Sequence, residues 1–343
     1  MIGKRIHRYR KNYFGIFLLL LAGATGTPAQ IDPERLKADE LVYVFEPVID
    51  NDELRFWVDL YFRGDFSGET TLILPSEWAG QFRYFEGIRE LQVTGARVRN
   101  GASEHIKKMQ HSPEAGLHVR YLLVQDRQES FSEPGAPYRP ILDPKYFHFI
   151  GHAALVHPEW NEARPVRVTI HWKNLPREWT VSNSFATNAR VQEMTVPPGQ
   201  LLHAIYVGGD FRVKKITVKD NPVYVAMRGT WEFADEEFVW LVENIVRSQR
   251  AFWGDQDFPY YLITLIPTGT ECCSYGGTGL QNSFATFIST NRGIDVMMKS
   301  LLSHELLHAW IGQKISVPDT PDEPEALFYW FSEGFTDYYA REL

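Results

Sequence analysis

His304-Glu305-Leu306-Leu307-His308 is the stretch of the sequence that narrows the fold most. On a helix its two histidines lie about one turn apart and point the same way, so they can bind one metal ion. Glu305 then lies beside an open position of that ion. The residues from Asp295 to Ser303 contain no glycine or proline, and Gly312 is a typical end signal. The sequence therefore predicts a helix that runs from Asp295 to about Gly312.

One stripe of this helix is predicted to face inward and to carry both histidines. Its members follow helical spacing: Met297, Leu301, His304, His308 and Ile311. The alternative is a buried helix whose histidines only satisfy hydrogen bonds in the core, because so short a pattern also arises by chance. In zinc peptidases the same pattern holds Zn²⁺ with two neutral imidazoles, and the glutamate takes a proton from the attacking water.

A tetrahedral zinc site needs a further protein ligand, which Glu333 can supply. Prolines between His308 and Glu333 favour a loop, followed by a second helix packed against the first. Asp337, one turn beyond Glu333 on the same face, can accept the free ring N–H of a zinc-bound histidine. An ordinary exposed glutamate is the alternative, but the aromatic neighbours of Glu333 disfavour it.

The two segments together resemble the gluzincin metallopeptidases, which have a thermolysin-like catalytic domain, and most of all their glycyl aminopeptidase family. The resemblance is carried by His304-Glu305-Leu306-Leu307-His308-Ala309-Trp310 and Trp330-Phe331-Ser332-Glu333-Gly334-Phe335-Thr336-Asp337-Tyr338-Tyr339. The membrane alanyl aminopeptidase family has similar motifs with a shorter interval between them. The resemblance implies Zn²⁺ bound by His304, His308 and Glu333, with Glu305 as the catalytic base and Asp337 as the partner of His304.

A glycine-rich run precedes the metal-binding helix and leads into Phe284–Ser289, which is predicted to be an edge strand. Glycine lets a substrate backbone approach closely, and an edge strand can pair with an extended peptide. The residues predicted to bind substrate are Gly277, Gly279, Leu280, Gln281 and Asn282. In related aminopeptidases the position of Gln281 is a glutamate that binds the free amine of the substrate. A neutral amide brings no charge to an ammonium group, so aminopeptidase and endopeptidase activity both stay open, as does a plain turn.

Composition indicates a globular enzyme of 343 residues, 44% of them hydrophobic. A net charge of −8 disfavours nucleic acid as a partner, because an acidic protein repels a phosphate backbone. The adjacent pair Cys272-Cys273 accounts for all the cysteine, and neighbouring cysteines rarely form an unstrained disulfide. We therefore expect no disulfide framework, and the sequence does not indicate an oligomeric state.

The N-terminus is predicted to be a signal peptide, residues 1–29. A basic segment, Lys4–Lys11, precedes the apolar segment Phe14–Ala22, and Thr27-Pro28-Ala29 offers a cleavage site. The apolar segment is short for a transmembrane helix, although an uncleaved membrane anchor is the alternative. We expect an exported protein, periplasmic or secreted, that meets a membrane only through this segment if it is uncleaved.

The rest of the chain is predicted to be α+β, with a β-rich, sandwich-like domain over residues 30–218 and an incomplete thermolysin-like domain over residues 219–343. Runs of β type support the first domain: Leu41–Phe45, Leu54–Phe62, Val166–Trp172 and Leu201–Val207. The second domain is predicted to open with a helix capped by Asp235 and ended by Gly254, followed by the strand Tyr260–Ile266.

His148 and His152 also lie four residues apart. Their aromatic, glycine-containing segment is typical of a strand, in which the two rings stand too far apart to share a metal ion. We expect core or surface histidines there.

Together these patterns predict a zinc-dependent peptidase, an aminopeptidase or endopeptidase, that acts on a peptide or protein. The alternative is a catalytically impaired, zinc-containing protein that holds extended peptides on its edge strand. By resemblance, the chain is expected to stop before the helical and PDZ parts of the family, as a fragment or a short member.

Overall fold

The computed structural model describes residues 31–126, 138–160, 164–268, 275–315 and 326–343. The predicted signal segment, the pair Cys272-Cys273 and the proline-rich segment Pro318–Pro324 lie outside the described residues. Asp32–Leu343 belong to one folded unit. Within the described ranges, no helix is both long and apolar enough to cross a membrane.

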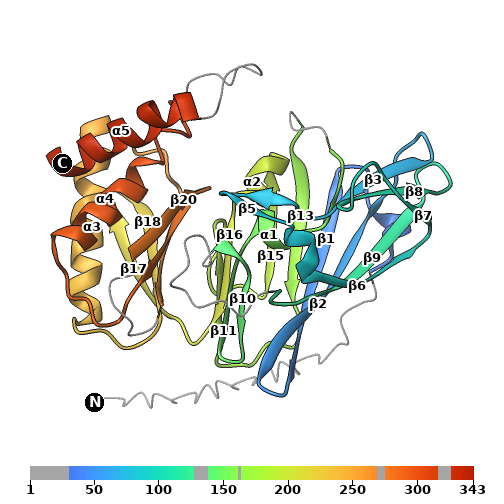
Figure 1. The fold of residues 1–343 in the computed structure, drawn as a ribbon, viewed down its shortest axis with the longest axis horizontal. Coiled ribbons are helices and arrows are strands. Elements are labelled where there is room, and N and C mark those ends of the chain that lie inside the picture. The colour runs from blue at the N-terminus through green and yellow to red at the C-terminus, as the bar shows by residue number, and fades with distance from the viewer. Residues whose placement is uncertain (1–30, 127–137, 161–163, 269–274, 316–325) are drawn as a thin grey trace, which may run out of the picture. The chain divides into compact units, whose positions relative to one another are not determined.

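The chain up to Gly209 consists mostly of strands (Figure 1). Its six-stranded sheet has the order β15 (Val191–Val196), β13 (Val166–Trp172), β1 (Glu40–Asp50), β2 (Glu53–Arg63), β9 (Gly116–Leu123) and β6 (Ile88–Thr94). One four-stranded sheet has the order β10 (Ile141–Asp143), β11 (Tyr146–Ile150), β16 (Ile205–Gly209) and β14 (Thr180–Asn183). A second has the order β12 (His157–Pro158), β3 (Glu69–Ile73), β8 (Ile106–Gln110) and β7 (Arg97–Asn100).

Short elements complete this part of the chain. They are the hairpin β4 (Glu77–Trp78) and β5 (Gln81–Phe82), the helices α1 (Gly151–Ala154) and α2 (Pro198–Leu202), and the 3₁₀ turns η1 (Pro33–Arg35) and η2 (Tyr84–Gly87).

These strands form where the chain alternates between hydrophobic and polar residues. In β2, Leu54, Phe56 and Val58 are buried, whereas the residues between them are partly exposed. Phe56 joins an aromatic core in which the Phe45 and Trp172 rings stack with centroids 4.7 Å apart. The predicted β-rich character is confirmed by this layered packing.

One predicted strand is wrong in part. Within Leu201–Val207, residues up to Leu202 belong to α2, and β16 begins only at Ile205. The reason is Pro198, whose fixed φ and missing N–H suit the first turn of a helix.

The remainder of the chain forms a five-stranded sheet with three helices. The sheet order is β17 (Arg212–Val218), β18 (Asn221–Met227), β19 (Tyr261–Pro267), β21 (Ser283–Ile288) and β20 (Tyr275–Leu280). The helices are α3 (Asp235–Trp253), α4 (Val296–Leu307) and α5 (Ala326–Glu342). Side chains of α3 and α4, including Phe238 and Leu302, pack on one face of this sheet (Figure 1).

The opposite face of the sheet packs against the β10-β11-β16-β14 sheet. Leu262, Ala285 and Phe287 on the one side share a buried cluster with Ile150 and Val207 on the other. The predicted α+β fold class is thus confirmed. The boundary between residues 218 and 219 stays a prediction.

α3 differs from the prediction at its start. Ala234 is the N-cap, and its backbone N–H donates to Glu237 Oε2 at 2.9 Å. Asp235 is the first helical residue and pairs with Arg212 at 2.7 Å, so its carboxylate is engaged by a cation instead of capping the helix. Gly254 ends the helix with φ 61°, the left-handed conformation that glycine tolerates best, as predicted.

Candidate metal centre

α4 carries His304 and is held at two points. The helix ends at Leu307, short of the predicted end near Gly312, and His308 is its C-cap. Asp295 caps it, because Asp295 Oδ1 accepts the backbone N–H of Met298 at 2.8 Å. From α3, the Gln249 side chain donates to the backbone oxygen and to the hydroxyl of Ser303, at 2.8 Å each. The residue before His304 is therefore fixed by a buried hydrogen-bonding side chain.

The predicted inward stripe of this helix is wrong at its start. Met298 and Leu302 are buried, whereas Met297 is 60% exposed. The sheet thus meets the helix on a face turned by one residue from the predicted stripe. His304 and His308 are only partly buried, with side chains 17% and 18% exposed, and they face α5.

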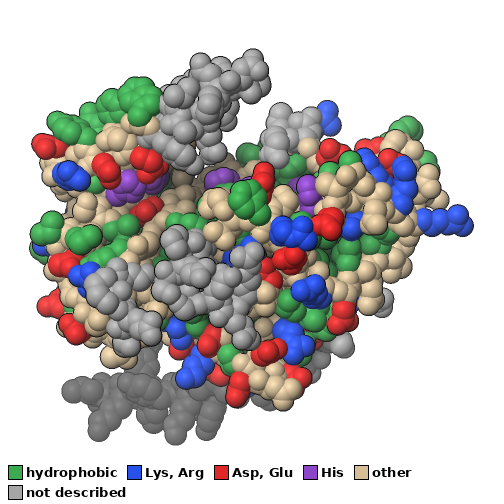
Figure 2. Space-filling model, in the orientation of Figure 1, with side chains coloured by type: hydrophobic (Ala, Val, Ile, Leu, Met, Phe, Trp, Pro, Cys, Tyr) green, Lys and Arg blue, Asp and Glu red, His purple; other side chains and the backbone are tan. Residues whose placement is uncertain are grey.

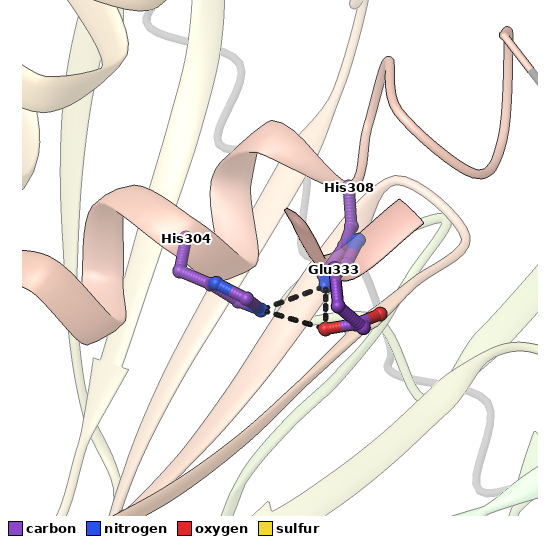
Figure 3. Close-up of side chains that lie close together, drawn as sticks. All are labelled: His304, His308 and Glu333. Carbon is purple, nitrogen blue, oxygen red and sulfur yellow. Dashed lines mark hydrogen bonds and ion pairs between the residues drawn. The ribbon is translucent and has the colours of Figure 1, made fainter. Parts of the chain in front are cut away.

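The structure brings His304, His308 and Glu333 together (Figure 3). His304 Nε2 lies 3.1 Å from His308 Nε2 and 3.2 Å from Glu333 Oε2. Glu333 Oε2 lies 3.7 Å from His308 Nε2. Among the described residues, this is the one group of at least three histidine, cysteine or acidic side chains whose ligand atoms can share a metal ion.

The other ring nitrogen of each histidine faces an acceptor. His304 Nδ1 lies 2.9 Å from Asp337 Oδ1, and His308 Nδ1 lies 3.3 Å from the backbone oxygen of Ile311. In a neutral imidazole that donates from Nδ1, the Nε2 atom carries a lone pair and no proton. With both histidines in this tautomer, two nitrogen lone pairs and a carboxylate oxygen face one another, an arrangement that a metal ion stabilises. Without a metal ion, a proton on His304 Nε2 can bind Glu333 Oε2 instead.

The donor set and its spacing fit zinc. Two imidazole nitrogens and one carboxylate oxygen form a common catalytic zinc site. Zinc–ligand distances of about 2.0–2.1 Å in tetrahedral geometry separate the ligand atoms by about 3.3 Å, which matches the observed separations. A partner on Nδ1 of a metal-binding histidine is also a usual feature of such sites.

The charges of the three groups depend on one another. Burial opposes protonation of His304, but Glu333, Glu305 and Asp337 outweigh it and raise the pKa of His304. The hydrogen bond from His304 lowers the pKa of Glu333, and burial lowers the pKa of His308. Figure 2 shows histidine and acidic side chains gathered below α5, beside exposed hydrophobic side chains of that helix.

Glu305 lies next to this group but is buried, with 6% of its surface exposed. Burial raises the pKa of Glu305 to about 8. The positive charge of His304 and a hydrogen bond from the backbone N–H of Gly279 act in the opposite direction and lower this pKa, but burial outweighs them. A carboxyl group with such a pKa can exchange protons near neutral pH.

The predicted edge strand is wrong. The glycine run itself forms the edge strand β20, and the apolar segment 283–288 is the internal strand β21, paired on both sides. Glycine is unfavourable in strands in general, but here α4 lies too close for side chains. A Cβ atom on Gly277 would lie 2.5 Å from Glu305 Oε1, and one on Gly279 would lie 2.6 Å from His308 Cβ.

The other predicted substrate residues lie at the end of this strand. Leu280 is fully buried, and Gln281 and Asn282 form the turn to β21, with Asn282 at φ 46°. The backbone N–H of Gln281 donates to the backbone oxygen of His203 at 2.9 Å. All five residues therefore lie on one edge beside α4.

His148 and His152, the other histidine pair with a spacing of four residues, lie in different secondary-structure elements. His148 lies in β11 with 1% exposure, and His152 lies in the short helix α1. His148 is therefore a core residue, which is one of the two alternatives, core or surface, that the sequence predicted.

Tyr138 is a residue of this site that the sequence patterns did not indicate. Its hydroxyl donates to the backbone oxygen of Gly277 at 3.0 Å. Tyr138 is far from Gly277 in the chain and belongs to no motif, so only the packing of the two parts reveals it.

Comparisons with known proteins agree with this architecture. No family model matches the sequence. Among solved structures, the aminopeptidase N family protein from Idiomarina loihiensis matches with a TM-score of 0.69 at 16% identity, over 88% of this chain and 53% of that chain. The two proteins share a fold. The match thus spans about half the length of the solved protein.

Sequence matches to curated proteins are local. Aminopeptidase O of Rattus norvegicus is 27% identical over 105 residues, which are 30% of this chain and 11% of that protein. Aminopeptidase O of Mus musculus is 26% identical over 105 residues, with the same shares. The finer resemblance to the glycyl aminopeptidase family is not confirmed by these matches.

Proposed function

We propose that this chain is a zinc metallopeptidase with His304, His308 and Glu333 as zinc ligands. The observation that carries the proposal is the convergence of two imidazole nitrogens and one carboxylate oxygen, which lie within 3.7 Å of one another. The names of the similar proteins support a peptidase in particular, since both are called aminopeptidases.

Zinc bound at this point would act as a Lewis acid on water and on the scissile carbonyl. Glu305 would take the proton that the attacking water gives up and deliver it to the leaving amine. The N–H of Gly279 holds the Glu305 carboxylate in place for this role. Asp337 would keep His304 in the tautomer whose Nε2 is free.

We propose an aminopeptidase-like activity in which the β20 edge and the Gln281–Asn282 turn position the peptide. The resemblance to the glycyl aminopeptidase family supports this assignment, and Gln281 modifies it. An amide donates and accepts hydrogen bonds but cannot form an ion pair with a free amine. The preference for a free over a blocked N-terminus is therefore expected to be weak.

The substitution Glu305→Gln tests the proposal. The variant should bind zinc like the wild type, because Glu305 is no ligand, and should lose at least about a hundredfold in kcat, the usual share of a general base. Zinc content and hydrolysis of peptides with free and acetylated N-termini are measured on the same samples. Full hydrolysis by the variant contradicts the assignment of the base, and zinc-loaded wild type without any hydrolysis contradicts the proposed function.

A further inference from the structure

β20 is the strand along which a peptide would lie, and the pairing of the hairpin shows which of its groups face outward. Leu280 and Ser283 pair across the two-residue turn, so they exchange main-chain hydrogen bonds. Because hydrogen-bonded and non-hydrogen-bonded pairs alternate, the main-chain groups of Gly277 and Gly279 point away from β21. They face the open edge of the sheet.

Two of these outward groups have partners within the chain. The Gly279 N–H is bound by Glu305, and the Gly277 oxygen accepts the hydroxyl of Tyr138 at 3.0 Å. Beyond them, the Gln281 N–H donates to His203 at 2.9 Å. An extended peptide that pairs with this edge must therefore compete with Glu305 for the Gly279 N–H and with Tyr138 for the Gly277 oxygen.

Tyr138 is held in place by its ring. The Trp78 ring packs on it edge-to-face with centroids 5.5 Å apart, and Phe287 of β21 packs on it at 6.3 Å. Burial, and then the nearby charges of Glu305 and Glu333, raise the pKa of Tyr138. The phenol therefore keeps its proton and donates to Gly277 at any physiological pH.

Strand pairing sets the direction of a bound peptide, and Glu305 sets the place of its scissile bond. Antiparallel pairing is the more stable kind, and it places the N-terminal end of the peptide near Gln281 and its C-terminal end near Tyr275. Gly279 contacts Glu305 and packs against His308, so the scissile carbonyl belongs near Gly279. The residues after the scissile bond then pass Gly277, where a peptide N–H would seek the oxygen that Tyr138 occupies.

We propose that Tyr138 is a specificity-determining residue that caps the Gly277 carbonyl and thereby disfavours peptides that extend more than one residue beyond the scissile bond. This inference rests on the proposed function, because it takes the β20 edge as the substrate site. A short ligand that ends before Gly277 never competes with Tyr138. A longer peptide displaces the hydroxyl before it can form its own hydrogen bond to Gly277.

Peptide binding tests the proposal without any catalytic readout. Dissociation constants are measured for an amino-acid amide and a tetrapeptide with the same first residue, on zinc-loaded Glu305→Gln protein with and without Tyr138→Phe. Phenylalanine keeps the ring packing and frees the Gly277 oxygen. The tetrapeptide should bind about two- to tenfold more tightly to the double variant, the range of one neutral hydrogen bond, and the amide should bind equally to both.

Tyr43→Phe is the matched control. The Tyr43 hydroxyl also donates to a backbone oxygen, that of Val156 at 2.9 Å, but Tyr43 lies in β1 of the six-stranded sheet, to which β20 does not belong. This control variant should leave the affinity ratio of the two ligands unchanged.

A ligand analogue is the second control. A tetrapeptide with an ester oxygen in place of the N–H that faces Gly277 should lose the gain in affinity produced by Tyr138→Phe.

Three results would overturn the proposal: a Tyr138→Phe variant that weakens both ligands equally, one that changes neither, or a gain that the ester analogue retains. Absence of tetrapeptide binding in all variants also overturns it, because no peptide then uses this edge. Failure of the proposed function is a separate result, namely zinc-loaded wild type that hydrolyses no peptide.

Discussion

His304 Nδ1 lies 2.9 Å from Asp337 Oδ1, so the first histidine of α4 is oriented by a carboxylate of α5. The contact joins two helices, and residues 316–325 of the segment between them lie outside the described residues. It fixes which nitrogen of His304 faces Glu333. The geometry of the candidate metal centre thus depends on how α5 packs on α4.

Asp337→Asn should weaken zinc binding about 10- to 100-fold, the usual effect of losing such a partner. The amide cannot hold the Nδ1 proton as a carboxylate does, and it can bind the ring in the wrong tautomer. Zinc affinity is measured by competition with a chromogenic chelator. Glu342→Gln, an exposed change at the end of the same helix, is the control and should bind zinc like the wild type. Equal affinity in both variants would show that Asp337 has no role in orienting His304.

Gly277→Ala should reduce peptide hydrolysis about a hundredfold while zinc stays bound. The new methyl group would meet Glu305 Oε1 at 2.5 Å, so the carboxylate must move, and a misplacement of about 1 Å has a cost of this size. Gly276→Ala is the matched control on the adjacent residue, because nothing lies within 4 Å of its Cβ position. Similar loss in both variants would mean that glycine is needed for the strand and not for Glu305.

Acid should destabilise the fold through His148. Its two buried ring nitrogens have no hydrogen-bond partner among the described residues, and the Phe287 ring packs against it with centroids 5.2 Å apart. Burial lowers the pKa of His148 to about 3, whereas the unfolded chain has about 6.5. Between these values the unfolded state binds more protons, so the free energy of unfolding falls as pH falls, by up to about 1.4 kcal/mol per pH unit.

His148→Leu should therefore reduce the loss of stability between pH 6.5 and pH 5. Denaturant unfolding of both proteins at pH 8, 6.5 and 5 measures this difference. The leucine variant should gain relative to the wild type at each step toward acid. A parallel pH dependence of the two proteins would show that His148 is not the residue responsible.

Local patterns predicted which side chains the structure brings together at the site, for physical reasons. The helical spacing of His304 and His308 leaves little freedom once α4 forms, and Glu333 and Asp337 share one face of α5 by the same periodicity. The features that depend on packing were missed. Strand preference favoured Phe284–Ser289 as the edge, but the closeness of α4 makes the glycine run the strand beside Glu305.

Distant contacts left no pattern in the sequence. Tyr138 reaches Gly277 and Gln249 reaches Ser303 from elements that are remote in the chain. The exposure of Met297 likewise depends on where the sheet meets α4, which periodicity alone does not determine.

Zinc content of the loaded and dialysed protein, measured by mass spectrometry on wild type, His304→Ala and Glu333→Ala, tests the central claim most directly. The account predicts about one zinc per wild-type chain and at most about a tenth of that in either variant, because each substitution removes one of three ligands. Wild type that takes up no zinc, or variants that retain it fully, would contradict the metal centre and the peptidase built on it.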